Sequence, residues 1–287
     1  MTRLKTTDIA SIKDELPIYE QGLIKSTGHS LEEIGVLSAN FLALNDGPKD
    51  EAKINKIMAE LKPADYSIAV IPVTAGQGKI KGFSQAVAAI LQYLNFPTEI
   101  TTNTDVAGIR ETLKKQHDIM FLADDKRFIA KNTDSYCWID NDRATALAYL
   151  IALELMAGGL EDREVLVLGA GRVGREAVKI LLKKEAKPVI YDKALNKKDL
   201  RTGELSQFAR ERISIKEKID VSQYSLIFEA TPARDLLKAS DITDQTFVAA
   251  PGIPAGFTTA AAEKLGANLI HDPLQLGVTA MAFSLIR

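Results

Sequence analysis

The stretch "VLVLGAGRVGREAVKILLKKEAKPVIYD", from Val165 to Asp192, decides the fold of the second half of this 287-residue chain. It opens with an apolar run of strand length, turns at a group of glycines, continues with helical periodicity and ends in a second apolar strand. Strand, glycine-rich turn, helix and strand in this order make the βαβ unit that binds dinucleotides. We therefore predict a Rossmann domain around this stretch.

The glycines of this stretch have G-x-G-x-x-G spacing. Gly169 would permit the tight turn, Gly171 the approach of a pyrophosphate and Gly174 the packing of helix on strand. The helix N-terminus would face the phosphates with unpaired N–H groups and a positive dipole end. Asp192 would bind the adenosine ribose and repel a 2′-phosphate, which favours NAD over NADP, although the neighbouring Lys193 leaves NADP open. The predicted cofactor residues here are Gly169, Ala170, Gly171, Arg172, Val173, Gly174 and Asp192.

Further strands follow at residues 213–216, 225–231, 246–252 and 268–273, and residues 274–286 have the pattern of a terminal helix. Small residues and prolines stand at the ends of two of these strands, in "EATPA" and "AAPGIP". The carboxyl ends of parallel strands form the binding edge of such a sheet, so these turns can lie against a nicotinamide. This assigns to the cofactor site Ala230, Thr231, Pro232, Ala250, Pro251 and Gly252.

The first half of the chain has a different pattern. The pattern predicts three helices, at residues 6–28, 30–47 and 49–63. The second begins with Ser30 and Glu33 at capping-box spacing. From residue 66 the pattern becomes strand, helix, strand, helix, strand, which predicts a small parallel βαβαβ sheet. The loops expected at its carboxyl edge are residues 74–82, the turn around Asp105, and residues 124–134.

The loop "TAGQGKIKG", residues 74–82, resembles a second phosphate loop but lacks the required spacing. In a P-loop, Ser or Thr follows the lysine, whereas Ile80 follows Gly78–Lys79 here. No acidic residue closes the next strand, as dinucleotide binding would require. We therefore assign this loop to the substrate, because Thr74, Ser84 and the free N–H groups of a helix start suit a carboxylate.

Asp124 and Asp125 end the third strand and face the same crevice. Adjacent residues in an extended segment point in opposite directions, so one of the two is expected to enter the site. We predict Asp124 as a base or as the partner of a substrate ammonium group. No metal site is predicted, because His29, His117 and His271 lack metal-ligand spacing.

Residues 144–156 are apolar on nearly every side, which predicts a helix buried between two domains. The predicted fold class is α/β. We divide the chain into a helical segment and α/β substrate domain at 1–143 (helices 1–62, βαβαβ about 66–143), a connecting helix at 144–159, and a Rossmann dinucleotide-binding domain with its terminal helix at 160–287.

The composition, 46% hydrophobic and 26% charged, is that of an ordinary globular protein. A net charge of −2 gives no reason to expect nucleic acid or an anionic membrane as a partner. The N-terminus has no signal-peptide apolar run, and Glu154 interrupts the longest apolar stretch. We expect a cytoplasmic protein that acts on a small molecule. The oligomeric state stays open, a homo-oligomer included.

Five motifs in order make a more specific pattern: "VIPVTAGQGKIKGFSQAVAAI", "LADDKRFIAKN", "VLVLGAGRVG", "IFEATP" and "APGIPAG". From about residue 70 to the C-terminus they resemble the PylD family of pyrrolysine biosynthesis. The resemblance implies NAD-dependent oxidation of the terminal amine of 3-methyl-D-ornithyl-Nε-L-lysine, with loss of ammonia and closure of the pyrroline ring. It also implies a substrate pocket, with Ala75 where the family has Ser. Its lining would be Val73, Thr74, Ala75, Phe83, Ser84 and Asp124.

Two other functions fit parts of the sequence. "KNTD", residues 131–134, resembles the signature of shikimate-type dehydrogenases, although "PVTAGQGK" meets their N-V-T-x-P-x-K pattern only in part. A non-catalytic NAD-sensing protein would keep "GAGRVG". Such a sensor would have no need for a polar pocket at Thr74, Ser84 and Asp124.

Overall fold

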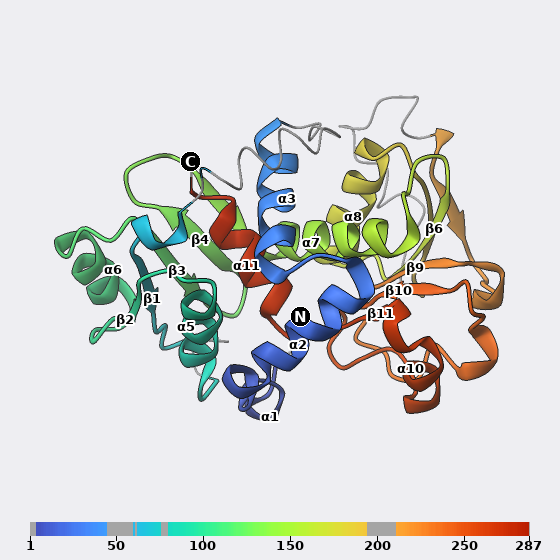
Figure 1. The fold of residues 1–287 in the computed structure, drawn as a ribbon, viewed down its shortest axis with the longest axis horizontal. Helices are drawn as coiled ribbons and strands as arrows, with labels where there is room; N and C mark the ends of the chain where they lie inside the picture. The colour runs from blue at the N-terminus through green and yellow to red at the C-terminus, as the bar shows by residue number, and fades with distance from the viewer. Residues whose placement is uncertain (1–3, 45–59, 61, 76–79, 194–210, 287) are drawn as a thin grey trace.

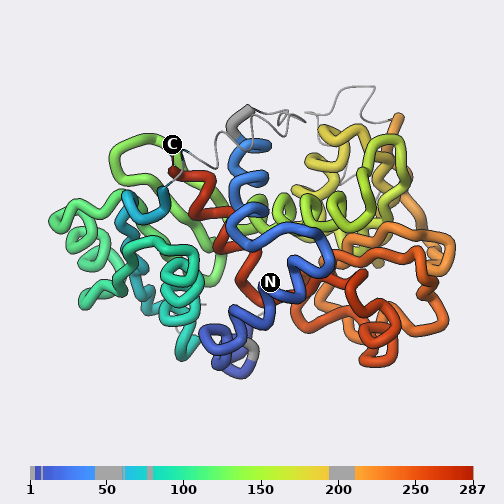
Figure 2. The backbone as a smooth tube through the Cα atoms, viewed as in Figure 1, coloured from blue at the N-terminus to red at the C-terminus, as the bar shows by residue number. Residues whose placement is uncertain are grey.

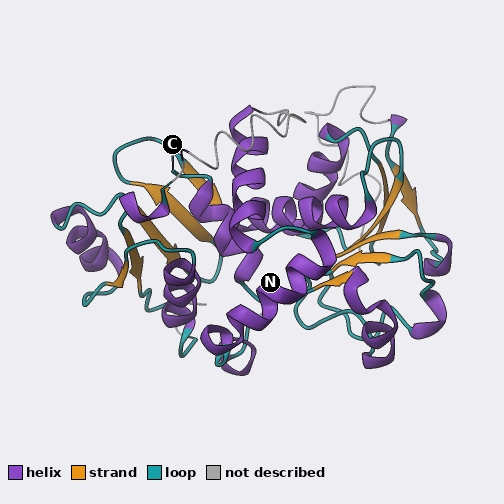
Figure 3. Cartoon of the chain, in the orientation of Figure 1, coloured by secondary structure: helices purple, strands orange, loops and turns teal. Residues whose placement is uncertain are grey.

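The computed structural model describes residues 4–44, 60, 62–75, 80–193 and 211–286, and within them it forms two β-sheets with helices around and between them (Figure 1). Figure 3 shows the strands in two groups at either side of the molecule, with helices filling the middle. The middle helices are α2 (Ile12–Thr27), α3 (Leu31–Leu44), α7 (Asn141–Ala157) and α11 (Gln275–Phe283).

The first sheet has the strand order β2-β1-β3-β4-β5. Its strands are β1 (Ile68–Ile71), β2 (Thr98–Ile100), β3 (Ile119–Ala123), β4 (Phe128–Asn132) and β5 (Trp138–Asp140), with α5 (Phe83–Tyr93), α6 (Asp105–Lys114) and the short helix η1 (Pro63–Asp65). Strands β1, β2 and β3 are parallel, as the βαβαβ pattern predicted. Strands β4 and β5 are antiparallel, so the complete sheet is mixed.

The prediction of a loop at residues 124–134 was therefore wrong for residues 128–132, which form a strand. The chain turns back after β3 and residues 128–132 pair with residues 119–123 as a hairpin. The sequence "FIAKN" alternates in burial, with Phe128 and Ala130 buried and Lys131 half-buried. This period of two is the signature of a half-buried strand, which the neighbouring charged residues concealed.

The second sheet has the order β11-β10-β9-β6-β7-β8, and all its strand pairs are parallel. Its elements are β6 (Glu164–Leu168), α8 (Arg172–Lys183), β7 (Lys187–Tyr191), β8 (Ser214–Lys216), η3 (Val221–Gln223), β9 (Leu226–Glu229), η4 (Ala239–Asp241), β10 (Phe247–Ala249), α10 (Thr259–Leu265), η5 (Gly266–Asn268) and β11 (Leu269–Ile270). Strand order reverses between β6 and β9, which is the topological switch point of a Rossmann sheet. The predicted Rossmann fold is confirmed.

The helices between the sheets share one continuous core. Figure 2 shows the N-terminal α3 and the C-terminal α11 side by side. Gly35 permits this contact, because a Cβ there would lie 2.5 Å from a ring carbon of Phe283. Helix α7 is buried on nearly all sides from Ala144 to Leu153, as predicted. Each large apolar side chain in such a position stabilises the fold by about 1.5–3 kcal/mol.

The N-terminal segment differs in detail from the prediction. The first predicted helix is divided into α1 (Thr6–Ile9) and α2, and α2 ends at Gly28 in the left-handed conformation. The predicted capping box is present, because the Ser30 N–H donates to Glu33 Oε2 and the Glu33 N–H donates to Ser30 Oγ. The helix predicted at 49–63 lies almost entirely outside the described residues. The predicted domain boundaries stay predictions.

Candidate functional site

A cavity of about 840 Å³ lies where the Rossmann loops meet helix α7 and the β3–β4 hairpin. Cavities of this size hold small ligands and cofactors, and they occur at switch points and between domains. Several of the sequence-predicted cofactor residues line it, namely Gly171, Arg172, Val173, Ala230, Pro232 and Pro251. The sequence therefore located the Rossmann wall of the cavity.

The GAGRVG turn is held by close backbone contacts. Gly169 has a φ of +93°, and a Cβ there would lie 2.8 Å from the Ala230 carbonyl oxygen. A Cβ on Gly174 would lie 2.0 Å from the Gly169 carbonyl oxygen. By contrast, a Cβ on Gly171 would meet nothing within 4 Å. Gly169 and Gly174 are required because neighbouring backbone atoms leave no room for a side chain. Gly171 has open space around it, on the side of the cavity.

This open space fits a dinucleotide. Gly171 is the N-cap of α8 and supplies no side-chain cap, so the N–H groups of the first turn face the cavity edge. Asp192 follows β7 directly, and its Oδ2 accepts a hydrogen bond of 2.7 Å from the Ala170 N–H. The ribose-binding carboxylate expected from the sequence is thus fixed beside the glycine turn.

The two turns predicted for the nicotinamide end are coupled by the buried Glu229. Its Oε1 accepts from the Thr231 N–H at 2.8 Å and from the Thr231 hydroxyl at 2.5 Å. Its carbonyl oxygen accepts from the Gly252 N–H at 3.1 Å, while a Cβ on Gly252 would lie 2.5 Å from Glu229 Oε2. Burial raises the pKa of Glu229. Thr231 and Gly252 thus support the wall that Ala230 and Pro251 expose, and Ala250 is buried next to Pro251.

A charged bridge crosses the cavity edge from the glycine turn to the first sheet. Arg172 Nε lies 2.9 Å from Asp142 Oδ2, and the Arg172 guanidinium also donates to the Lys126 carbonyl oxygen. Arg127 lies 3.0 Å from Asp140 Oδ2 and 3.6 Å from Asp142 Oδ2. Burial and the adjacent Asp140 raise the pKa of Asp142 to about 6 against the opposing effect of Arg172. Arg172 therefore fastens the two parts of the molecule together.

None of the six residues predicted for the substrate is among those that line the cavity. The Thr74 N–H and hydroxyl donate to the Asp105 carboxylate at 2.9 and 2.7 Å, which lowers the pKa of Asp105. Phe83 and Ser84 are buried at the start of α5, and the Phe83 ring packs edge-on against Phe128 at 5.3 Å. Phe128 lines the cavity, so Phe83 supports its wall from behind. Val73 is half-buried and Ala75 exposed.

Asp124 caps the β3–β4 turn. Its Oδ1 accepts from the Lys126 N–H at 2.7 Å and from the Arg127 N–H at 2.8 Å. These backbone bonds lower the pKa of Asp124, because they stabilise the charged carboxylate. A lowered pKa weakens a proton acceptor. Asp125, rather than Asp124, is the member of this pair that lines the cavity.

The polar residues on the helix α7 side of the cavity were not predicted from the sequence. Asn141, Asp142, Thr145 and Tyr149 line it from α7, and Asp272 lines it from the segment after β11. The spacing of the α7 residues at i, i+4 and i+8 places Asn141, Thr145 and Tyr149 on one helix face. That polar stripe in an otherwise apolar helix was the signal that could have indicated this wall.

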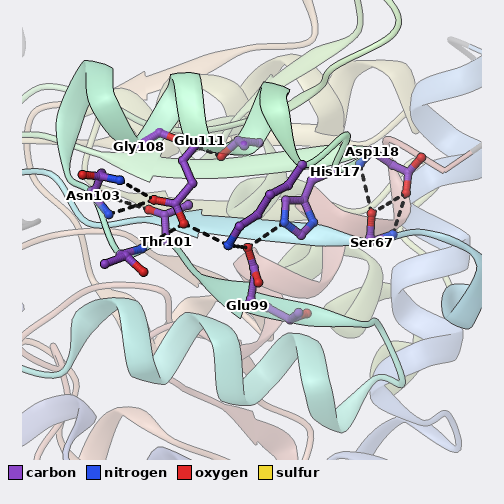
Figure 4. Close-up of polar contacts among 12 residues, drawn as sticks. Ser67, Glu99, Thr101, Asn103, Gly108, Glu111, His117 and Asp118 are labelled. Carbon is purple, nitrogen blue, oxygen red and sulfur yellow. Dashed lines mark hydrogen bonds and ion pairs between the residues drawn. The ribbon is translucent and has the colours of Figure 1, made fainter.

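A second polar network lies at the far end of the first sheet (Figure 4). Glu111 accepts a hydrogen bond of 2.9 Å from the Asn103 N–H. This bond is the largest of the effects that lower the pKa of Glu111 to about 2. Lys115 lies 2.7 Å from Glu99 Oε1, and His117 Nε2 lies 2.8 Å from the same oxygen. These contacts fasten α6 to β2. They give His117 a structural role.

Within the described ranges, no group of three or more His, Cys, Asp or Glu side chains is placed to hold a metal ion. In the same ranges, no helix is both long and apolar enough to span a membrane.

Comparison with known proteins agrees with this architecture. The family model described as "Pyrrolysine biosynthesis protein PylD, N-terminal domain" matches residues 8–137, and a model described as NAD(P)-binding matches residues 156–245. A pyrrolysine synthase of Methanosarcina acetivorans is 32% identical over 227 residues, covering 78% of this chain and 84% of that protein. One from Methanosarcina barkeri is 29% identical over 220 residues, covering 76% and 81%.

A more distant relative is the shikimate dehydrogenase (NADP(+)) of Vesicomyosocius okutanii, which is 26% identical over 184 residues and covers 64% of this chain and 61% of that protein. The relation to the pyrrolysine synthases is closer in identity and covers more of both chains. The five motifs of the sequence and the NAD(P)-binding fold are also consistent with a relation to the pyrrolysine synthases. This chain belongs to the PylD family of pyrrolysine biosynthesis proteins.

Proposed function

We propose that this chain is the NAD-dependent dehydrogenase that completes pyrrolysine. It would oxidise the terminal amine of 3-methyl-D-ornithyl-Nε-L-lysine to an imine. Water then replaces the nitrogen, which releases ammonia and leaves an aldehyde, and the α-amine of the same unit condenses with that aldehyde to close the pyrroline ring. The observation that carries the proposal is the identity to pyrrolysine synthases over most of the chain.

The cavity suits such a reaction. When bound, the nicotinamide cofactor supplies the two-electron acceptor. The GAGRVG turn would hold its pyrophosphate, and Ala230 and Pro251 would face its nicotinamide end. Asp192, 2.7 Å from the Ala170 N–H, supports NAD over NADP, because a carboxylate at this position repels a 2′-phosphate.

The roles of the other predicted residues are part of the proposal. Thr74, with Val73 and Ala75, would shape one edge of the substrate space. Phe83 and Ser84 would support the wall that Phe128 exposes. For Asp124, the sequence proposes a base, whereas its turn-capping bonds favour holding the hairpin that carries Arg127 and Phe128.

The shikimate-type alternative has one relative in its favour. Against it, Lys131 and Asn132 of the "KNTD" signature form hydrogen bonds within the protein. Lys131 Nζ donates to the carbonyl oxygens of Asn132 and Ser135 at 2.8 and 2.6 Å. The Asn132 amide oxygen accepts from the N–H groups of Asp134 and Ser135. These groups are engaged in the β4–β5 connection.

The deciding experiment mixes the protein with NAD and the methylornithyl-lysine dipeptide, and follows NADH absorbance together with product mass. We expect NADH to form with loss of ammonia and ring closure. Turnover of shikimate with NADP in place of the dipeptide would overturn the proposal. A protein that binds NADH and oxidises neither compound would be a sensor.

A further inference from the structure

Asp272 is the carboxylate that carries this inference. It lies in the segment between β11 and α11, is only 4% exposed, and lines the cavity together with Tyr149. Two tyrosine hydroxyls from distant segments contact its Oδ2, Tyr19 of α2 at 2.9 Å and Tyr149 of α7 at 2.9 Å. A carboxylate held by two other segments has a fixed position, which binding sites require.

The remaining oxygen of Asp272 is less engaged. Among the described residues, the recorded partner of Oδ1 is the Leu276 N–H, at a long 3.3 Å. An ionised carboxylate can accept about four hydrogen bonds. Oδ1 therefore keeps acceptor capacity for a ligand in the cavity.

Asp272 also differs from Asp142, the other half-buried or buried carboxylate that lines the cavity. Asp142 is paired with Arg172 and Arg127. No Lys or Arg of the described residues forms an ion pair with Asp272. A buried carboxylate without a cation is costly, and an incoming cation would stabilise it. This carboxylate is therefore suited to an ammonium group.

Its place in the sheet puts Asp272 next to the predicted nicotinamide turn. Strand β11 pairs with β10, Ala249 lying opposite Ile270. Beyond this pair, His271 Nδ1 lies 2.7 Å from the Ala250 carbonyl oxygen, and Pro251 and Asp272 line the same cavity. A group bound to Asp272 would thus lie beside the turn that faces the reacting end of the cofactor.

We propose that Asp272 binds the amine that is oxidised and accepts its proton, with Tyr19 and Tyr149 as positioning residues. This inference rests on the proposed function and names the group within that site. The substrate enters as R–CH₂–NH₃⁺ and one N–H proton passes to Asp272. One hydrogen of the adjacent carbon would then leave with its bonding electron pair, for which a bound nicotinamide cofactor is the acceptor, and R–CH=NH₂⁺ would remain. A protonated amine cannot release that hydrogen with its electrons, so the proton transfer must come first.

The electrostatics of Asp272 agree with this role. Burial raises its pKa, and the hydrogen bonds from Tyr19 and Tyr149 and the charge of His271 oppose the shift. Glu229 is the other acidic group that acts on the same cluster, through Tyr149. The ionised form of Asp272 accepts the proton, so activity falls as the pH drops through its pKa. A raised pKa places this acid limb above the ordinary range of an aspartate.

The test uses the full chain and three variants, Asp272→Asn, Tyr19→Phe and Asp124→Ala. Calorimetry measures binding of the methylornithyl-lysine dipeptide to the NADH complex, in which no oxidation occurs. We expect Asp272→Asn to weaken this binding at least tenfold and to lower kcat/KM about 100-fold, as loss of a general base does. NADH binding and the melting temperature of each variant show whether it is folded.

The pH profile separates a direct role from a structural one. Tyr19→Phe removes a hydrogen bond to the charged carboxylate, so the acid limb of kcat/KM should move to higher pH while activity above the limb is largely kept. Asp272→Asn should lose the limb, and Asp124→Ala should keep it. Dipeptide binding and an acid limb that Asp272→Asn leaves unchanged would overturn the inference, as would loss of the limb in Asp124→Ala.

Failure of the proposed function gives a different result. A parent protein that binds the dipeptide but forms no NADH with it would refute the proposed reaction. The binding comparison then still decides for or against Asp272. A parent that binds no dipeptide would overturn both.

Discussion

The chain contains two turns in which a buried strand runs through glycines into a helix, and the structure uses them differently. After β6, the turn is short and each of its flanking glycines is fixed by a contact, Gly174 against the Gly169 carbonyl oxygen and Gly169 against Ala230. After β1, Gly82 caps α5 with a φ of +90°, but a Cβ there would meet nothing within 4 Å.

The difference shows that glycine can be required in such a turn for two separate physical reasons. In the Rossmann turn, glycine is needed because another backbone occupies the space of a side chain. In the first turn, Gly82 is needed only for its backbone angle. The Rossmann turn brings a helix N-terminus close to a strand and leaves room for a phosphate, whereas Gly82 provides only the backbone angle at which α5 begins.

The largest effect should come from Gly174→Ala. Its Cβ would lie 2.0 Å from the Gly169 carbonyl oxygen, so helix α8 must move away from β6. Overpacking of this kind costs about 1–3 kcal/mol and would distort the phosphate turn. We expect a melting temperature lower by several degrees and NADH binding weaker by at least 100-fold, measured by fluorescence titration.

Gly82→Ala is the matched change in the first turn. It introduces strain at a positive φ of +90° but no collision, so about 1 kcal/mol of stability should be lost while NADH binding is unchanged. Equal loss of NADH binding in both variants would show that the two turns do not differ as described.

The sequence predicted the Rossmann turn well because its causes are local. The glycine spacing, the strand before it and Asp192 after it lie within one βαβ unit, and the physical roles of Gly169 and Gly174 follow from that unit alone. The buried helix α7 was also predictable, because its apolar residues on every face leave it no stable place at a surface.

The opposite wall of the cavity could not be predicted in the same way. Tyr149 and Asp272 are 123 residues apart, and their contact depends on how α7 packs against the segment after β11. Asp124 was chosen for its place at the end of a strand. Its turn-capping role depends on the hairpin with β4, where the sequence predicts a loop.

A smaller effect is expected from Asp192→Asn, which measures how much the charge of this residue contributes to cofactor binding at the Rossmann turn. Asn keeps an oxygen that can accept from the Ala170 N–H but removes the negative charge. Weaker bonding to the ribose should raise the Kd for NADH about tenfold, equal to about 1.4 kcal/mol, while the Kd for NADPH should fall. Titration of both cofactors against both proteins measures this. A parent protein that binds NADPH as tightly as NADH would contradict it.

The smallest effect should come from Thr74→Val in the first turn. Val keeps the backbone N–H that donates to Asp105 Oδ1 but removes the hydroxyl that donates to Oδ2 at 2.7 Å. The loop loses one of two bonds to an exposed carboxylate, and exposed bonds contribute little, so it should loosen without unfolding. We expect KM for the dipeptide to rise about threefold with kcat and NADH binding unchanged, because looser positioning of the loop costs on the order of 0.6 kcal/mol. Thr74→Ser, which keeps the hydroxyl, should restore KM. If Thr74→Val weakened NADH binding instead, the first turn would contact the cofactor. The assignment of the turn after β6 to the cofactor and of the turn after β1 to the substrate would then be wrong.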